Sequence, residues 1–198
     1  MWQGLFGFIS SIPEKLGLFK FKSQDIPSAT VTSDASVDFL FKVLQVTRES
    51  AGDKQAVYPL LQANLDKLDE NFTLLLRNWA LDSLSKAQAD DVRAIATTIF
   101  IFSKLIQEFP LGSKAVNQDM AIAGYETVLS VYTRDAFPVD WAMTQNNLAI
   151  AYFNRIKGER ADNLERAIAF YTAALEVHTR NVFSERWAMT QNNLANAY

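Results

Sequence analysis

Two asparagine pairs give the strongest indication of binding chemistry in this sequence. Asn146-Asn147 and Asn192-Asn193 hold the same place in the segments WAMTQNNLAIAY (141–152) and WAMTQNNLANAY (187–198), which agree at eleven of twelve positions. Asparagine is a mediocre helix former, so a pair inside a helix needs a physical reason. Its amide donates and accepts hydrogen bonds, which suits contact with the backbone of a bound peptide. The same property suits a ladder of bonds between successive helices, and both interpretations stay open.

Residue types that perform catalysis or hold a metal are scarce. The chain has one histidine, His178, and no cysteine, which excludes a histidine pair and a cysteine nucleophile. We expect His178 to be a surface or packing residue of a repeated helix rather than part of a Ser-His-Asp arrangement. Acidic pairs such as Asp69-Glu70 fit helix starts or solvated faces, and neither a GxGxxG nor a Walker pattern is present. We therefore expect no enzymatic activity and no catalytic, cofactor-binding or metal-binding residues.

The overall composition is that of a globular protein. The 198 residues are 49% hydrophobic and 21% charged, and the net charge of −3 argues against general affinity for nucleic acid. No apolar run approaches the roughly 20 residues that a transmembrane helix needs. Together with the absence of cysteine, these features favour a cytoplasmic protein.

The first 33 residues differ from the rest of the chain. Residues 1–22 begin apolar and carry their lysines after the apolar start, the reverse of a secretory signal. Residues 23–33 form a short polar segment. We expect an apolar arm and a flexible linker over 1–33, with the arm packed on the fold or against a partner. Contact of residues 1–22 with a membrane surface is the less favoured alternative.

Helical periodicity begins at residue 34 and predicts an all-α fold. Helices are expected over about 34–50 and 90–109. Between them, apolar residues recur in steps of four and three, which predicts one long helix after Pro59. This seam consists of Leu61, Leu65, Leu68, Phe72, Leu75 and Trp79. We expect residues 34–94 to form a helical N-terminal domain.

The second half of the chain repeats itself with a period of 46 residues. When 95–140 is set over 141–186, fourteen of the 46 positions are identical, and 187–198 begins a third copy. A fixed period in this range is the signature of a stacked repeat architecture. The second unit is predicted to hold helices at about 141–155 and 163–180. Because the third copy is partial, we expect a fragment of a longer array, or else a terminal capping helix.

Small and large residues alternate in these units in a way that resembles the tetratricopeptide repeat. The positions that carry the resemblance are Leu148, Ala149, Tyr152, Ala167, Tyr171 and Ala174. Both connections are longer than in the usual unit of about 34 residues. The lengthened unit is similar to kinesin light chain repeats and to the 46-residue arrays of cyanobacterial multidomain proteins, often ahead of a caspase-like CHAT domain. The resemblance implies antiparallel helix pairs stacked as a right-handed α-solenoid over 95–198.

The resemblance also implies which residues bind and which pack, because the first helix of each unit lines the inner surface in that family. It assigns peptide binding to Met143, Asn146, Asn147, Ile150, Phe153, Asn154, Met189, Asn192, Asn193 and Asn196. It assigns packing between repeats to Trp141, Leu148, Ala149, Tyr152, Ala167, Tyr171, Ala174, Trp187, Leu194 and Tyr198.

These observations favour a scaffold that binds a peptide or protein segment on a concave surface made by the first helices. One alternative is the sensor or regulatory N-terminal part of a larger protein whose effector domain lies beyond residue 198. A self-assembling structural solenoid is another alternative, and the partial third unit could also support a homodimer.

Overall fold

The computed structural model describes residues 34–198, and this part of the chain is all-α, as the periodicity predicted. No strand occurs within it. The α-helices are α2 (Asp34–Glu49), α3 (Lys54–Gln62), α4 (Glu70–Lys86), α5 (Ala89–Glu108), α6 (Lys114–Val128), α7 (Pro138–Phe153), α8 (Arg160–Leu175) and α9 (Ser184–Ala197), with a short 3₁₀ helix, η3 (Leu65–Lys67). Among these residues no helix has both the length and the apolar character needed to cross a membrane.

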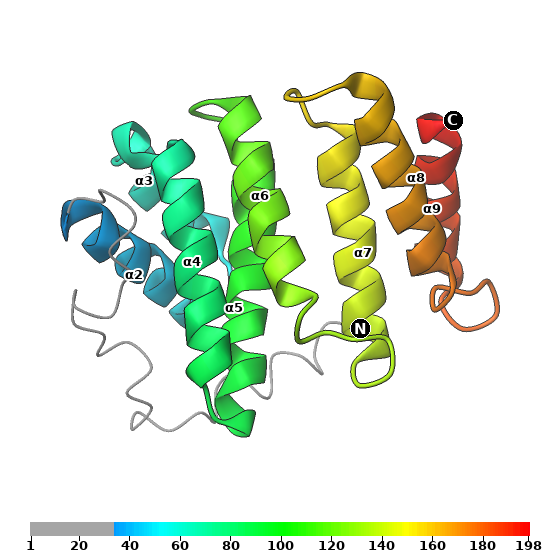
Figure 1. Ribbon diagram of the computed structural model, residues 1–198, viewed down its shortest axis with the longest axis horizontal. Helices are drawn as coiled ribbons and strands as arrows, with labels where there is room; N and C mark the ends of the chain where they lie inside the picture. The colour runs from blue at the N-terminus through cyan, green and yellow to red at the C-terminus, as the bar shows by residue number, and fades with distance from the viewer. Residues whose placement is uncertain (1–33) are drawn as a thin grey trace.

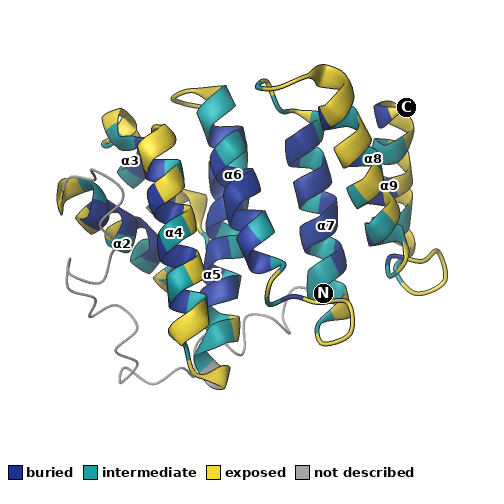
Figure 2. Ribbon diagram, in the orientation of Figure 1, coloured by how far each residue is buried: buried dark blue, intermediate teal, exposed yellow. Residues whose placement is uncertain are grey.

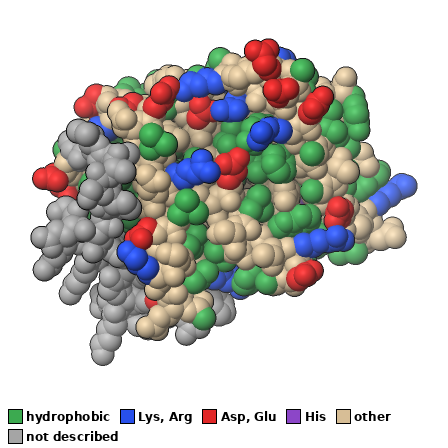
Figure 3. Space-filling view, in the orientation of Figure 1, with side chains coloured by type: hydrophobic (Ala, Val, Ile, Leu, Met, Phe, Trp, Pro, Cys, Tyr) green, Lys and Arg blue, Asp and Glu red, His purple; other side chains and the backbone are tan. Residues whose placement is uncertain are grey.

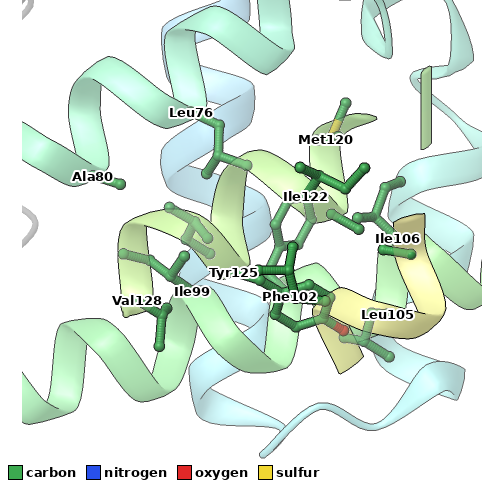
Figure 4. Packing of buried hydrophobic residues seen from close by; sticks show 14 of the residues in the cluster. Leu76, Ala80, Ile99, Phe102, Leu105, Ile106, Met120, Ile122, Tyr125 and Val128 are labelled. Carbon is green, nitrogen blue, oxygen red and sulfur yellow. The ribbon is translucent and has the colours of Figure 1, made fainter. Parts of the chain in front are cut away.

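From α5 onward, each helix packs against the next one along the chain, and α4 packs against α6. Consecutive helices run in opposite directions from α5 to α9 (Figure 1). Buried residues line the facing sides of these helices (Figure 2). Figure 4 shows how Ile99 and Phe102 of α5 lie beside Tyr125 and Val128 of α6. One cluster of buried hydrophobic residues therefore extends from Val37 to Ala197.

The predicted domain boundary does not coincide with a break between helices. The boundary between residues 94 and 95 lies inside α5, and the buried cluster runs across it. The predicted arm and linker at 1–33 lie outside the described residues.

The prediction of one long helix after Pro59 is wrong. The chain forms α3 and α4 instead, separated by the 3₁₀ helix η3. Helix α4 has its own N-cap and is not a continuation of α3. The Asp69 carboxylate accepts a hydrogen bond from the Phe72 N–H at 2.8 Å and so caps the start of α4. Of the six seam residues, Leu65 is 38% exposed and the other five are buried. The apolar pattern thus identified the core-facing residues but could not show that a cap interrupts the helix.

The 46-residue period is present in the backbone. Helices α6 and α8 begin 46 residues apart, and so do α7 and α9. Gly112 and Gly158, the glycines shared by the two turns, have φ values of +76° and +78°. This left-handed conformation favours glycine, which explains why both units keep it.

A buried asparagine holds the turn in each unit. Asn117 Nδ2 donates to the Leu111 carbonyl at 2.9 Å, and Asn163 Nδ2 donates to the Lys157 carbonyl at 2.8 Å. Both asparagines are almost fully buried, and their acceptors are also 46 residues apart. The amide therefore replaces a backbone donor where the chain turns into the second helix of the unit.

Replacing Asn163 by alanine should lower the free energy of unfolding by about 1–3 kcal/mol, because the Lys157 carbonyl loses its donor. Asn117→Ala should have a similar cost in the first unit. The matched control is Asn154→Ala, because the exposed Asn154 amide bonds Ile150 within its own helix; it should change stability by less than about 0.5 kcal/mol. Urea denaturation followed by circular dichroism measures all three, and equal costs for Asn163 and Asn154 would contradict the prediction.

Candidate functional site

The two residues of the first asparagine pair lie in different environments. Asn146 is only 3% exposed, and its Oδ1 lies 3.2 Å from Thr190 Oγ1 of α9, whose hydroxyl it shares as acceptor with the Arg186 carbonyl at 2.7 Å. Asn147, the next residue, is half-buried. The side chain of Asn146 therefore links α7 to α9, which favours the structural interpretation for this residue.

The remaining predicted binding residues of α7 include one regular row. Met143, Asn147, Ile150 and Asn154 follow one another at steps of four, three and four, so they share one face of the helix. The first three are half-buried and Asn154 is exposed. Phe153 is also half-buried, and the Arg160 guanidinium lies over its ring at 5.0 Å. The face is therefore accessible but only partly so.

Helix α9 carries the matching row. Met189 is 50% exposed, Asn193 is half-buried and Asn196 is exposed. Asn192 is also exposed and lies toward the edge of this row. Because α7 packs against α9, the two rows together define what we call the α7–α9 surface. Its members are Met143, Asn147, Ile150, Asn154, Met189, Asn193 and Asn196, none of which carries a charge.

The predicted packing residues of the second unit lie in the core. Leu148, Ala149, Ala167 and Ala174 are fully buried. Tyr171 is 2% exposed, and Trp141 packs against the core while partly exposed. In the third unit Trp187 and Leu194 are half-buried, and Tyr198 is 87% exposed. The helices of the second unit therefore pack against neighbouring helices on both sides, whereas α9 packs against neighbours on one side.

Tyr152 joins three helices through both its ring and its hydroxyl. The ring stacks on Phe170 of α8, with centroids 5.5 Å apart. The hydroxyl donates to Glu126 Oε1 of α6 at 2.8 Å and accepts from Arg166 of α8 at 3.1 Å. Burial and the Glu126 carboxylate raise the pKa of this phenol. Sequence reasoning missed Phe170, because the matching position in the first unit is Gly124; the aromatic next to Tyr171 was the available signal.

An ion-pair network connects α4, α6 and the turn between α7 and α8. Lys157 lies 2.6 Å from Glu70 and 3.2 Å from Asp119, and Arg155 lies 2.8 Å from Asp119. Acidic and basic side chains are both present across the face in Figure 3, among hydrophobic and uncharged ones. The Lys157–Glu70 pair is exposed and contributes little to stability. The Arg155–Asp119 pair is partly buried, so the network joins a solvated turn to a more enclosed contact with α6.

His178 is a buried packing residue. It is 1% exposed, and its ring contacts Phe183 edge-on at 5.9 Å. The matching residue of the first unit, Tyr132, contacts Phe137 in the same way, and its hydroxyl pairs with Thr97 Oγ1 at 2.7 Å. Met143 stands where that threonine would be, and neither ring nitrogen of His178 has a hydrogen-bond partner among residues 34–198.

The environment of His178 disfavours its charged form. Burial, and secondarily the nearby Arg186 charge, lower its pKa from 6.5 to about 4. Within the described part of the chain, no group of three or more His, Cys, Asp or Glu residues could hold a metal ion.

No protein-family model, curated protein or solved structure matches this chain. The function is accordingly argued from the repeat and from the surfaces that its helices present.

Acidification should destabilise the protein through His178. Its pKa is lower in the folded state than the 6.5 of an unfolded chain, so the unfolded state takes up the proton first as the pH falls. The stability contributed by the neutral ring is present above about pH 6.5 and is lost toward pH 4, with a total near 3 kcal/mol.

His178→Phe keeps the ring contact with Phe183 and removes the titrating group. Urea denaturation at pH 7, 5.5 and 4.5 should show a shallower loss of stability for this variant than for the wild type. Parallel pH profiles for the two proteins would contradict the assignment.

Proposed function

We propose that α5–α9 are tetratricopeptide-like repeats of a right-handed α-solenoid, and that the chain is a protein–protein interaction module. Three observations support the repeat assignment: the 46-residue period, the matching glycine turns, and the burial of small residues beside tyrosines between consecutive helices. In such an array the first helices of successive units, α5, α7 and α9, share one side. That side would be concave and would carry the α7–α9 surface.

The observation that carries the proposed function is the uncharged polar row that α7 and α9 repeat in the same register. Met143 matches Met189, and Asn147 matches Asn193. These residues are exposed or half-buried on both helices. Surface positions on helices are ordinarily rich in charge, so an Asn and Met row calls for a reason beyond solubility.

The chemistry of this row suits an extended peptide segment. Asparagine amides can bond backbone N–H and C=O groups at once, without regard to the side chains of the ligand. Methionine adapts its shape to apolar groups of different sizes. The module would therefore recognise main-chain shape first and an apolar side chain second.

Asn147 and Asn193 are the residues whose replacement should weaken binding. Each alanine variant should lose about tenfold in affinity, because one backbone hydrogen bond contributes roughly 1.5 kcal/mol at a partly buried site. The ligands for this measurement are peptides selected from a displayed library of random sequences, and isothermal titration calorimetry measures their affinity. The melting temperature should change by less than about 3 °C, since neither change opens a core cavity.

Asn181→Ala is the matched control for these two variants. Asn181 is exposed in the connection between α8 and α9 and should leave affinity unchanged. Selected peptides that bind the Asn147 and Asn193 variants as tightly as the wild type would contradict the proposed surface.

Asn146 should behave differently, because its amide oxygen is bonded to Thr190. Asn146→Ala and Thr190→Val should each destabilise the protein by about 1 kcal/mol or more, with a coupling of at least about 0.5 kcal/mol in the double variant. A double-mutant cycle of unfolding free energies measures this coupling. Two outcomes would contradict the structural role of Asn146 and assign it to the binding surface instead. One is additive effects of the two substitutions, and the other is a loss of peptide affinity for Asn146→Ala at unchanged stability.

A further inference from the structure

Helix α4 is apolar on two sides, and only one of them is covered by residues 34–198. The covered side contributes Phe72, Leu76 and Trp79 to the core. Leu74 and Leu81 lie seven residues apart on the opposite side of the helix and are 47% and 45% exposed. Because a helix that is apolar all round is ordinarily buried, the exposed side of α4 is expected to have an occupant.

Uncharged residues extend this exposed side along most of α4. Three of them alternate with the two leucines at steps of three and four, so all five lie on one face of the helix. We call this face the α4 stripe; it consists of Asn71, Leu74, Asn78, Leu81 and Ser85. Exposed residues recur along α4 in Figure 2. The spacing of the stripe is the one by which a helix packs on a second helical segment.

The first twelve residues of the chain carry apolar side chains at the same spacing. Steps of three, four and three separate Trp2, Leu5, Ile9 and Ile12, and Pro13 follows. These steps gather the four side chains on one side when the segment docks as a helix. Leu5 and Ile12 are seven residues apart, as are the two exposed leucines of α4.

This segment is connected to the described fold close to α4. Helix α2 begins at Asp34, and less than two turns later Phe39 packs on Phe72 of α4, with ring centroids 5.2 Å apart. Helix α4 is about 25 Å long at 1.5 Å per residue. The connection from 13 to 33 can span more than twice that length. A tether of this kind gives an effective concentration near the millimolar range, which favours the segment over a separate partner.

We propose that residues 1–12 dock on the α4 stripe of their own chain. A second copy fits this stripe poorly, because a two-fold pairing of α4 helices centred between the two leucines places the exposed Arg77 near the same residue of the copy. Residues 1–12 contain no charged side chain and therefore bring none against Arg77. The α4 stripe shares no residue with the α7–α9 surface, so this proposal does not depend on the proposed function.

Limited proteolysis of the full chain tests the docking. Chymotrypsin cleaves after Phe8, and mass spectrometry follows the release of residues 1–8. The rate of this cleavage reports the fraction of undocked segment when docking is fast. Combining Leu74→Asp with Leu81→Asp should raise the rate about tenfold, because a carboxylate resists burial against apolar side chains.

Ile156→Asp is the matched control for this double variant. Ile156 is 59% exposed in the turn between α7 and α8, and its replacement should leave the rate of cleavage after Phe8 unchanged. All three substituted positions are exposed, so the helical content measured by circular dichroism should equal that of the wild type.

Cross-linking locates the docked segment in a chain with otherwise unchanged residues. The sequence contains no cysteine, so introduced cysteines are the only thiols. Ser10→Cys combined with Asn78→Cys should react with a short bismaleimide to form an intramolecular cross-link. Ser10→Cys combined with Gln62→Cys should form at least about tenfold less. Gln62 is a suitable control because it is exposed on α3, which packs against α2.

Two results would overturn the proposal. One is an unchanged cleavage rate in the double aspartate variant, or equal cross-linking of Ser10→Cys to the two positions. The other is a dimer of the full chain that the double aspartate variant dissociates, as measured by light scattering after gel filtration. In that case the α4 stripe would be an interface between copies.

Discussion

The fold depends on small residues that meet aromatic residues where successive helices face each other. Between α7 and α8, Ala149 and Ala167 are fully buried, so the two backbones approach closely, while Tyr152 and Tyr171 fill the space beside them. The same combination recurs in the first unit, where Ala121 and Tyr125 of α6 are fully buried. A larger residue at an alanine position would overpack the contact, and a smaller one at a tyrosine would leave a cavity. This constraint accounts for the residues that the two units keep.

Polar groups at the edges of these contacts add direction to the packing. The Tyr152 hydroxyl reaches Glu126 and Arg166, so one buried ring also aligns α6 with α8. In the first unit the Tyr132 hydroxyl finds Thr97. His178 takes the place of that tyrosine in the second unit, where Met143 aligns with Thr97. It keeps only the aromatic contact, so a satisfied polar pair is replaced by a ring that is sensitive to protonation. A position with a fixed packing role can thus acquire different chemistry.

Sequence reasoning reached the all-α class, the limits of α2 and α5 to within about a residue, and the 46-residue period, because these depend on local patterns. The glycine turns and the Ala and Tyr positions repeat, and repetition is visible without coordinates. The break at η3 was missed because Asp69 reads equally well as a solvated residue or as a cap, and only the neighbouring backbone decides. Phe170 was missed for a related reason: it has no counterpart in the first unit, and its partner Tyr152 is on another helix.

The asparagine pairs show why residue type alone could not separate stacking from binding. Neighbouring residues of a helix point about 100° apart, so one of two adjacent side chains can face the next helix while the other faces outward. Asn146 takes the first direction and bonds Thr190, whereas Asn147 lies on the row shared with Met143 and Ile150. The two interpretations that the sequence left open therefore need not compete. In the first pair Asn146 links α7 to α9 and Asn147 is left to the surface, whereas in the second pair Asn192 is exposed and Asn193 is half-buried.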